Sequence, residues 1–283
     1  MIRLFRAAVI AVMLVLPAGL SGVTAAEPAA PIHHDADVRL DPENRLLTVS
    51  DVISVSGRQE IRFRLASWLT VERLTLDGRA LPVPAGGNVW RTSLPDAGPH
   101  RIGLHLQGTV PLMEPAGRGG LGQSGALGPD GGYLFESAGW IPLTGDERAS
   151  WSLRVEVPAS HRAVATGRLG EELIGDTRYS ARFTAEDTLD LPALFVGRYA
   201  VQERLSGDIR LRTYFYRDDA ALSEIYLSDS ARYLKRYQFL IGPYPFRDFH
   251  VISAPVPVGL GFPSLTYIGR RILPLPFIRT RSL

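Results

Sequence analysis

Residues 153–158 read Leu-Arg-Val-Glu-Val-Pro, in which apolar and charged side chains alternate until a proline ends the run. This period of two is typical of a β-strand with one buried face, and proline ends a strand because it has no N–H to donate. The pattern recurs on both sides between Gly, Pro and Asp turns, at 46–55, 61–65, 102–106, 179–183 and 209–215. We therefore expect a mostly β protein, with a large antiparallel β-domain over residues 36–205.

Beyond this domain the apolar spacing becomes helical between Asp218 and Ile241. Asp218 or Asp219 would cap the first turn, and Gly242-Pro243 would end the helix. One apolar stripe is expected to face the core: Leu222, Ile225, Tyr226, Tyr233, Tyr237 and Leu240.

Residues 1–26 have the layout of a secretory signal peptide. Arg3 and Arg6 precede an uninterrupted apolar run at 7–16. Such a run is shorter than the roughly 20 residues that span a bilayer. We expect an exported protein, periplasmic or secreted, without a stable membrane span once the signal is removed. An uncleaved N-terminal anchor is the alternative.

Small residues at the end of this segment form a candidate signal-peptide cleavage site, after Ala25 or Ala26. Residues 27–35, which include the pair His33-His34, are expected to form a flexible leader. A solvated tail is the preferred interpretation of that histidine pair, ahead of a loose metal site.

Charge and cysteine content exclude several classes of partner and site. The chain has 31 basic and 29 acidic residues, and removing the signal with Arg3 and Arg6 leaves 29 of each sign. A nucleic-acid partner is not expected, because binding a phosphate backbone requires a concentrated positive surplus. The absence of cysteine excludes disulfides, thiolate metal sites and a cysteine nucleophile.

No complete active site is apparent in the sequence. The six histidines, at 33, 34, 100, 105, 161 and 250, include no pair at helical i, i+4 spacing that would bind zinc. G-x-S-x-G and P-loop motifs are also absent from the sequence. We therefore assign no catalytic and no metal-ligating residue.

The stretch 117–132 is half glycine, and we expect it to be a mobile surface loop. Within it, residues 120–125 spell G-x-G-x-x-G. This motif binds dinucleotides only between a strand and a helix, and no helix is expected to follow here.

Short motifs along the chain resemble, in order, the N-terminal half of the aminopeptidase N family of gluzincin-type zinc metallopeptidases. They are Val38-Arg39-Leu40-Asp41-Pro42 in the opening strands, Trp140-Ile141-Pro142 after the glycine loop, Leu153 to Pro158 with Thr166-Gly167, Phe195 to Tyr199 at the close of the β-domain, and Gly242-Pro243-Tyr244-Pro245-Phe246 after the helix.

The resemblance implies a saddle-like sandwich over 36–205, followed over 206–283 by the beginning of an α/β thermolysin-like catalytic domain. It also implies zinc as cofactor and peptides as substrates. The family's H-E-x-x-H motif lies downstream of the matched segment, so no residue of this chain takes the role of a zinc ligand. We expect the N-terminal part of an exported zinc metallopeptidase, truncated before the zinc helix.

A candidate site follows from the same resemblance. Residues 259–266 resemble the family's G-M-E-N-P-x-L-T stretch, whose Glu binds the substrate's amino terminus and whose backbone pairs with the peptide. Gly261 stands in place of that Glu and cannot supply a charge-assisted bond to an ammonium group. We predict that a substrate-facing strand edge is formed by Gly259, Leu260, Gly261 and Phe262.

Two other functions remain open. One is a non-catalytic periplasmic β-sandwich that binds peptides or a partner protein. The other is a carbohydrate-binding sandwich, which would present tryptophans on an exposed strand face. The candidates are Trp68, Trp90, Trp140 and Trp151, although a buried core position is expected for most of them.

Overall fold

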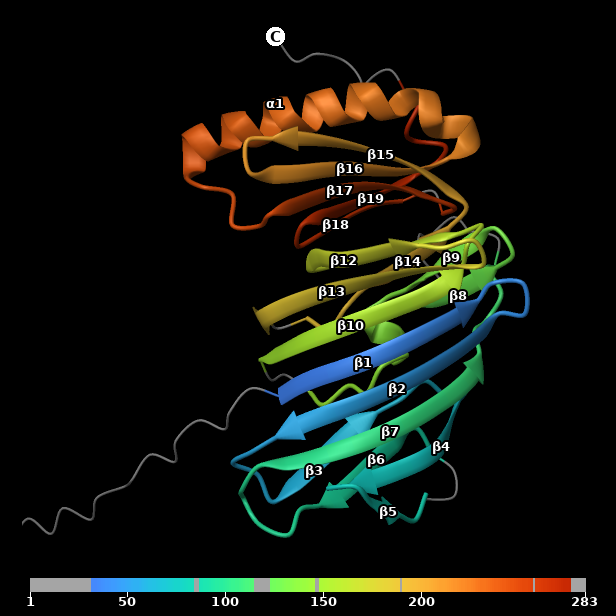
Figure 1. The fold of residues 1–283 in the computed structure, drawn as a ribbon, viewed down its shortest axis with the longest axis vertical. Coiled ribbons are helices and arrows are strands. Elements are labelled where there is room, and N and C mark those ends of the chain that lie inside the picture. Colours follow the sequence, from blue (N-terminus) through green and yellow to red (C-terminus); the bar gives the residue numbers. More distant parts are fainter. Residues whose placement is uncertain are drawn as a thin grey trace, which may run out of the picture.

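The computed structural model describes residues 32–83, 87–114, 123–145, 148–188, 190–256 and 258–275. Strands dominate this part of the chain, in two units stacked along the long axis, with the helix α1 at one end (Figure 1). The expected mostly β fold is confirmed. The expected signal peptide and residues 27–31 of the leader lie outside the described residues.

The large sheet of the first unit contains eight described strands in the order β12-β13-β10-β1-β2-β7-β4-β5. Neighbouring strands are antiparallel except β1 and β10, which run parallel. The strands are β1 (Ile32–Asp41), β2 (Leu46–Val55), β4 (Leu69–Leu76), β5 (Arg79–Leu81), β7 (His100–Thr109), β10 (Ala149–Pro158), β12 (Arg168–Ile174) and β13 (Arg178–Thr188).

Two smaller sheets share one buried apolar cluster with the large sheet, which makes the first unit a sandwich. Their strands are β8 (Gly125–Gly128), β9 (Gly131–Leu134), β11 (Arg162–Ala165), β14 (Leu194–Gly197), β3 (Glu60–Arg64) and β6 (Val89–Ser93). In β10, Leu153, Val155 and Val157 are fully buried, while Arg154 is exposed. The alternation in the sequence therefore marks which face of the strand meets the core.

The expected mobile loop at 117–132 is wrong for its second half, because β8 and β9 form a buried hairpin there. A Cβ on Gly132 would collide with the backbone of Ala126 on the neighbouring strand. Glycine here permits close packing of strands rather than chain mobility. Residues 115–122 lie outside the described part of the chain, and Gly125 begins a strand rather than a helix.

The leader expected up to residue 35 is wrong for residues 32–35, which are the start of β1. Ile32, His34 and Ala36 point into the core on alternate positions. The ring Nδ1 of His34 lies 2.7 Å from Oδ2 of Asp51 on β2, and both side chains are completely buried. A carboxylate partner across the sheet allows this histidine to be buried.

The sheet of the second unit has the described strands in the order β15-β16-β17-β19-β18, and α1 lies across it (Figure 1). It begins at Tyr199, ahead of the expected boundary at residue 206. The elements are β15 (Tyr199–Ser206), β16 (Ile209–Tyr216), the 3-10 helix η2 (Arg217–Leu222), α1 (Ser223–Ile241), β17 (Asp248–Ala254), β18 (Gly259–Phe262) and β19 (Leu265–Gly269).

The expected helix is present, but its buried stripe differs from the expected one. The buried side chains are Ser223, Leu227 and Leu234, whereas Tyr237 is 54% and Leu240 59% exposed. Leu227 and Leu234 pack on β16, whereas the side chains of residues 235–241 are exposed. The prediction that Tyr237 and Leu240 face the core is therefore wrong.

The helix ends are partly as expected. Gly242 ends α1 with a φ of 115°, a conformation that favours glycine. Asp218 and Asp219 fall in η2 and pair with Arg270 instead of capping α1. Within the described residues, no helix combines the length and apolarity needed to cross a membrane.

Candidate functional site

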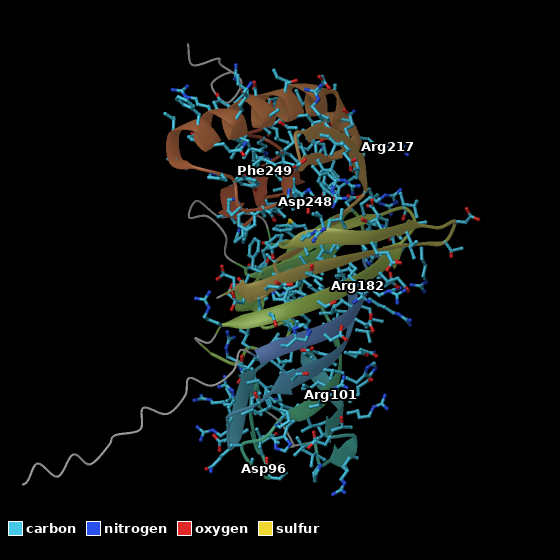
Figure 2. All side chains as sticks on the ribbon, turned by 60° about the vertical axis from the view of Figure 1, so that its left-hand side comes forward. Asp96, Arg101, Arg182, Arg217, Asp248 and Phe249 are labelled. Atoms are coloured by element: carbon cyan, nitrogen blue, oxygen red, sulfur yellow. The ribbon has the colours of Figure 1, made fainter. Side chains whose placement is uncertain are left out.

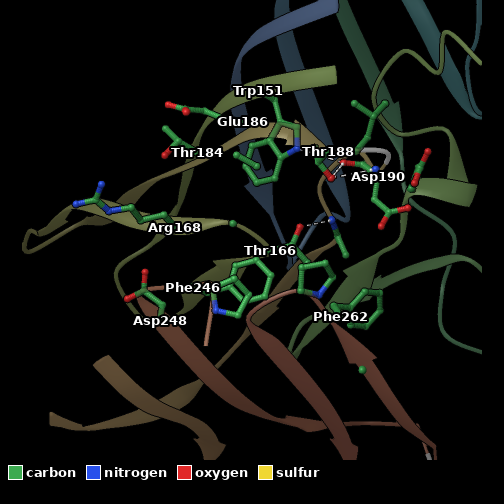
Figure 3. A pocket seen from close by; sticks show the side chains of 18 of the residues that line it. Trp151, Thr166, Arg168, Thr184, Glu186, Thr188, Asp190, Phe246, Asp248 and Phe262 are labelled. Carbon is green, nitrogen blue, oxygen red and sulfur yellow. Dashed lines mark hydrogen bonds between the residues drawn. The ribbon is translucent and has the colours of Figure 1, made fainter. Parts of the chain in front are cut away.

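A cavity of about 970 Å³ lies where the two units meet (Figure 3). The first unit lines it with the 3-10 helix η1 (Glu136–Ala138), the turn between β11 and β12, and the end of β13. The second unit contributes residues 245–248 and 261–263. The predicted site residues Gly261 and Phe262 therefore reach this cavity, whereas Gly259 and Leu260 extend the same strand beyond its lining.

β18 is an edge strand that pairs, among the described strands, with β19 alone. The N–H of Gly269 donates to the carbonyl of Val258 at 2.7 Å. Because ladder bonds alternate along an antiparallel pair, the N–H and C=O groups of Gly259 and Gly261 point away from β19. Gly259 and Gly261 are both exposed, so this edge is open to a ligand.

An aromatic cluster holds the edge strand against the first unit. The ring of Phe262 lies 5.6 Å from Phe135 and 5.6 Å from Phe195, and Phe195 lies 4.6 Å from Tyr267 on β19. Aromatic pairs at these separations add to the stabilisation from burial alone. One face of β18 is therefore fixed while its backbone edge stays free.

The turn between β11 and β12 forms another part of the cavity wall. Gly167 has a φ of 93°, and a Cβ there would lie 2.5 Å from the ring of Trp151 and 2.6 Å from the carbonyl oxygen of Thr184. Only glycine permits this close approach. The hydroxyl of Ser264, in the β18–β19 turn, donates to the Gly167 carbonyl at 3.2 Å, which links the turn to the second unit.

A buried ion pair joins the two sheets beside the cavity. Arg210 Nε donates to Oδ1 of Asp248 at 2.6 Å, and the Asp248 side chain is 1% exposed. Oδ2 of Asp248 accepts from the N–H of Leu169 on β12, while Arg210 also donates to the Leu169 carbonyl. One residue of the first unit is thus held through both of its backbone groups.

Glu136, on η1, lines the same cavity as Gly261 and Phe262. Burial, together with the charge of Asp190, raises the pKa of Glu136 above its ordinary value, although the Leu191 N–H and the Arg64 charge act in the opposite direction. The sequence reasoning missed this residue. Its signal is a carboxylate two residues after the buried strand β9 and four residues before Trp140.

The described residues do not fit a zinc ion. Within the described ranges, no group of three or more His, Asp or Glu side chains could hold a metal. The whole sequence also lacks H-E-x-x-H. The zinc implied by the resemblance is therefore assigned to no residue of this chain.

The tryptophans do not form an exposed sugar-binding face. Trp90, Trp140 and Trp151 are 7%, 0% and 2% exposed, and Trp68 is partly buried against the same core. The expectation that most of them are core residues is confirmed.

Solved structures share this fold. The M1 zinc metallopeptidase from Deinococcus radiodurans aligns with a TM-score of 0.67 and 19% identity, over 84% of this chain and 60% of that chain. A point mutant from the same organism, bound to a Tyr-Ser-Ala substrate, aligns with the same score and 19% identity over 89% of this chain and 62% of that one. This chain therefore spans about three fifths of the length of these structures.

At this level of identity the likeness establishes the fold, which is that of M1 zinc metallopeptidases. The sequence itself matches no protein-family model and no curated protein.

Proposed function

We propose that this chain is the N-terminal part of an exported, aminopeptidase-like zinc metallopeptidase, and that its cavity binds a peptide along β18. The unpaired backbone edge at Gly261, a residue that also lines the cavity, is the observation that carries the proposal. An extended peptide adds to such an edge through main-chain hydrogen bonds, which are independent of its side chains. The M1 structure bound to Tyr-Ser-Ala supports peptides as the ligand class.

Glu136 would recognise the free amino terminus of the bound peptide. It is half-buried in the same cavity, and Asp190 adds negative potential to the lining. A charge-assisted hydrogen bond from an ammonium group to a carboxylate is stronger than a neutral one, and burial strengthens it further. Gly261 has no side chain with which to share this role.

The residues of this chain would bind and orient the substrate. In zinc peptidases the metal supplies an activated water for attack on the peptide carbonyl. Because the described residues include no group that fits a zinc ion and the sequence lacks H-E-x-x-H, the proposal requires other residues to supply that step.

Titration of the peptide Tyr-Ser-Ala into the ¹⁵N-labelled protein tests this proposal. We expect amide shifts at Gly259–Phe262, and we expect weaker binding when the peptide is N-acetylated. Glu136→Gln should lower the affinity for the free peptide and leave the affinity for the acetylated peptide unchanged. Shifts confined to residues away from β18 and η1 would refute the assignment of the groove.

A non-catalytic peptide-binding protein is the second candidate. The observation that favours it is the lack of a zinc-binding group in the described residues. Incubation of Tyr-Ser-Ala with the purified chain and added zinc tests whether this chain alone carries the catalytic step. Binding without cleavage agrees with both functions, whereas zinc-dependent cleavage by this chain alone would contradict our assignment of the zinc ligands.

We also propose export, on the basis of the charged start and apolar run in residues 1–26. The mass of the protein recovered from a secreting bacterial host tests it. A mature N-terminus after Ala25 or Ala26 is expected, and an intact Met1 in an exported protein would indicate an uncleaved anchor.

A further inference from the structure

A second cavity, of about 750 Å³, opens at the junction of the units and carries four arginines. It lies beyond the carboxyl ends of the parallel strands β16, β17 and β19, where Tyr216, Pro255 and Arg270 line it. Ligands of α/β proteins commonly bind beyond the carboxyl ends of parallel strands. The four arginines come from both units: Arg162 and Arg198 from the first, Arg217 and Arg270 from the second.

Two of these arginines are already paired with carboxylates. Arg198 lies 2.7 Å from Glu43 but 3.7 Å from Asp130, and the Asp130 side chain is 90% exposed. Arg270 contacts Asp219 at 2.8 Å and Asp218 at 3.2 Å, and the Asp219 side chain is only 15% exposed whereas that of Asp218 is 85% exposed. Exposed ion pairs contribute little to stability, so Arg198 can turn towards a stronger anion, whereas Asp219 holds Arg270 in place.

The other two arginines pair with no carboxylate among the described residues. The guanidinium of Arg162 donates to the carbonyls of Ala159 and His161 at 2.9 and 2.7 Å, and it lies 5.1 Å from the Tyr179 ring centre. These contacts hold it in place without neutralising it. Arg217 is exposed at the start of η2 (Figure 2). Arg198 and Arg270 are compensated by the carboxylates that they contact, so the two uncompensated positive charges of the lining are those of Arg162 and Arg217.

Two tyrosines complete the cavity wall. Tyr199 and Tyr216 are 7% and 8% exposed, and Arg270 lies 4.8 Å above the Tyr216 ring. The stacking orients the Arg270 fork at the cavity wall. Arg162 and Arg270, which these contacts hold in place, can bind an anion at a low cost in ordering their side chains.

We propose that this cavity binds a phosphate dianion, as free phosphate or as a terminal phosphomonoester, between Arg162 of the first unit and Arg217 of the second. Two excess positive charges match a dianion, and the planar guanidinium fork matches two phosphate oxygens. An anion held from both units also fixes one unit relative to the other. Binding should therefore raise the thermal stability of the whole chain.

Calorimetric titration with inorganic phosphate, at ionic strength held constant with chloride, tests the site. Arg217→Ala should weaken binding by about tenfold or more, because a charge-assisted bond is lost. Arg217→Glu should abolish it. Arg236→Ala removes an exposed arginine of α1 that does not line the cavity, and it should bind as the wild type does. Since Arg217 is exposed, both of its variants are expected to fold.

The melting temperature provides a second measurement. Phosphate should raise it in the wild type and in Arg236→Ala, and should leave Arg217→Glu unchanged. Phenyl phosphate then separates the two sources of the anion. Tighter binding than that of inorganic phosphate points to a phosphomonoester, and equal or weaker binding points to free phosphate. Equal phosphate affinity in Arg217→Glu and the wild type would overturn the proposal, as would no measurable binding of either ligand to the wild type.

Discussion

Asp248 and Leu169 lie 79 residues apart in the sequence, yet Oδ2 of Asp248 accepts a hydrogen bond from the Leu169 N–H at 3.1 Å. Arg210 completes this contact by donating to both Asp248 and the Leu169 carbonyl. The edge of the large sheet is thereby fixed to the start of β17, beside the first cavity, which both Arg168 and Asp248 line. The shape of the groove depends on this contact.

Asp248→Ala should lower the free energy of unfolding by about 3 kcal/mol, because it leaves a partly buried guanidinium and a backbone N–H without their partner. Urea denaturation measures the loss. Asp208→Ala is the matched control, since Asp208 is 90% exposed and its pairing with Arg247 is long, at 3.5 Å. Similar losses in the two variants would show that the buried contact has no special role.

His250 should make the protein less stable in acid. It is fully buried, and within the described residues neither of its ring nitrogens has a hydrogen-bond partner. Burial, with the charges of Arg212 and Arg210, lowers the pKa of His250 to about 3, and the Tyr214 ring packs at 5.5 Å. The imidazole is therefore neutral in the folded protein at pH 5, whereas in the unfolded chain it is protonated below about pH 6.5.

Protonation of His250 in the unfolded chain therefore lowers the free energy of unfolding. The full value is present above about pH 6.5 and falls progressively as the pH drops towards 3, with a loss of about 2 kcal/mol at pH 5. Urea denaturation at pH 7.5 and pH 5 measures this difference. His250→Phe should show a smaller drop than the wild type, and the remaining drop includes His161, whose pKa is lowered by burial. An identical drop in both proteins would contradict the assignment.

Gly261→Glu should restore a carboxylate at the edge of the cavity without disturbing the strand. A Cβ at Gly261 meets nothing within 4 Å, and this glycine does not have a positive φ. We expect unchanged stability and about tenfold tighter binding of Tyr-Ser-Ala through its ammonium group. Gly259→Glu, on the same strand but outside the cavity lining, is the control for charge alone. Equal gains in the two variants would argue against a localised amine site.

Gly167→Ala should be destabilised by about 2 kcal/mol or more, because it combines an unfavourable φ with overlap on Trp151 and Thr184. Gly207→Ala separates the two effects, because Gly207 has a φ of 61° with nothing within 4 Å of its Cβ. A cost of about 1 kcal/mol is expected there. Thermal or urea denaturation compares the two variants. Equal losses of stability in Gly167→Ala and Gly207→Ala would show that the close packing around Gly167 is not rigid.

The sequence predicts the strands well because a half-buried strand has a local period. Residues 153–158 fall in β10 and residues 209–215 in β16, with the apolar side chains inside. The glycine-rich hairpin β8–β9 has no such period, because its strands meet through backbone contacts that need small residues. The burial of His34 depends on Asp51 across the sheet, which no local pattern reveals.

The candidate site was predicted in part. The resemblance located β18, and the structure shows that only its second half reaches the cavity. Glu136 and Asp248 line the same cavity although they are far apart in the sequence, and Asp248 is held there by a contact with Leu169 of the other unit. Periodicity shows which face of a strand is buried, but the stacking of two sheets decides which residues meet.

Peptide binding by Gly261→Pro and Gly261→Ala tests the central claim most directly. Proline removes the outward N–H of residue 261 at an edge position where the β18–β19 ladder does not use it, and alanine retains it. The account predicts that Gly261→Ala binds Tyr-Ser-Ala as the wild type does. Gly261→Pro should remain folded but lose affinity for the peptide by at least about tenfold. Wild-type affinity in a folded Gly261→Pro variant would contradict it.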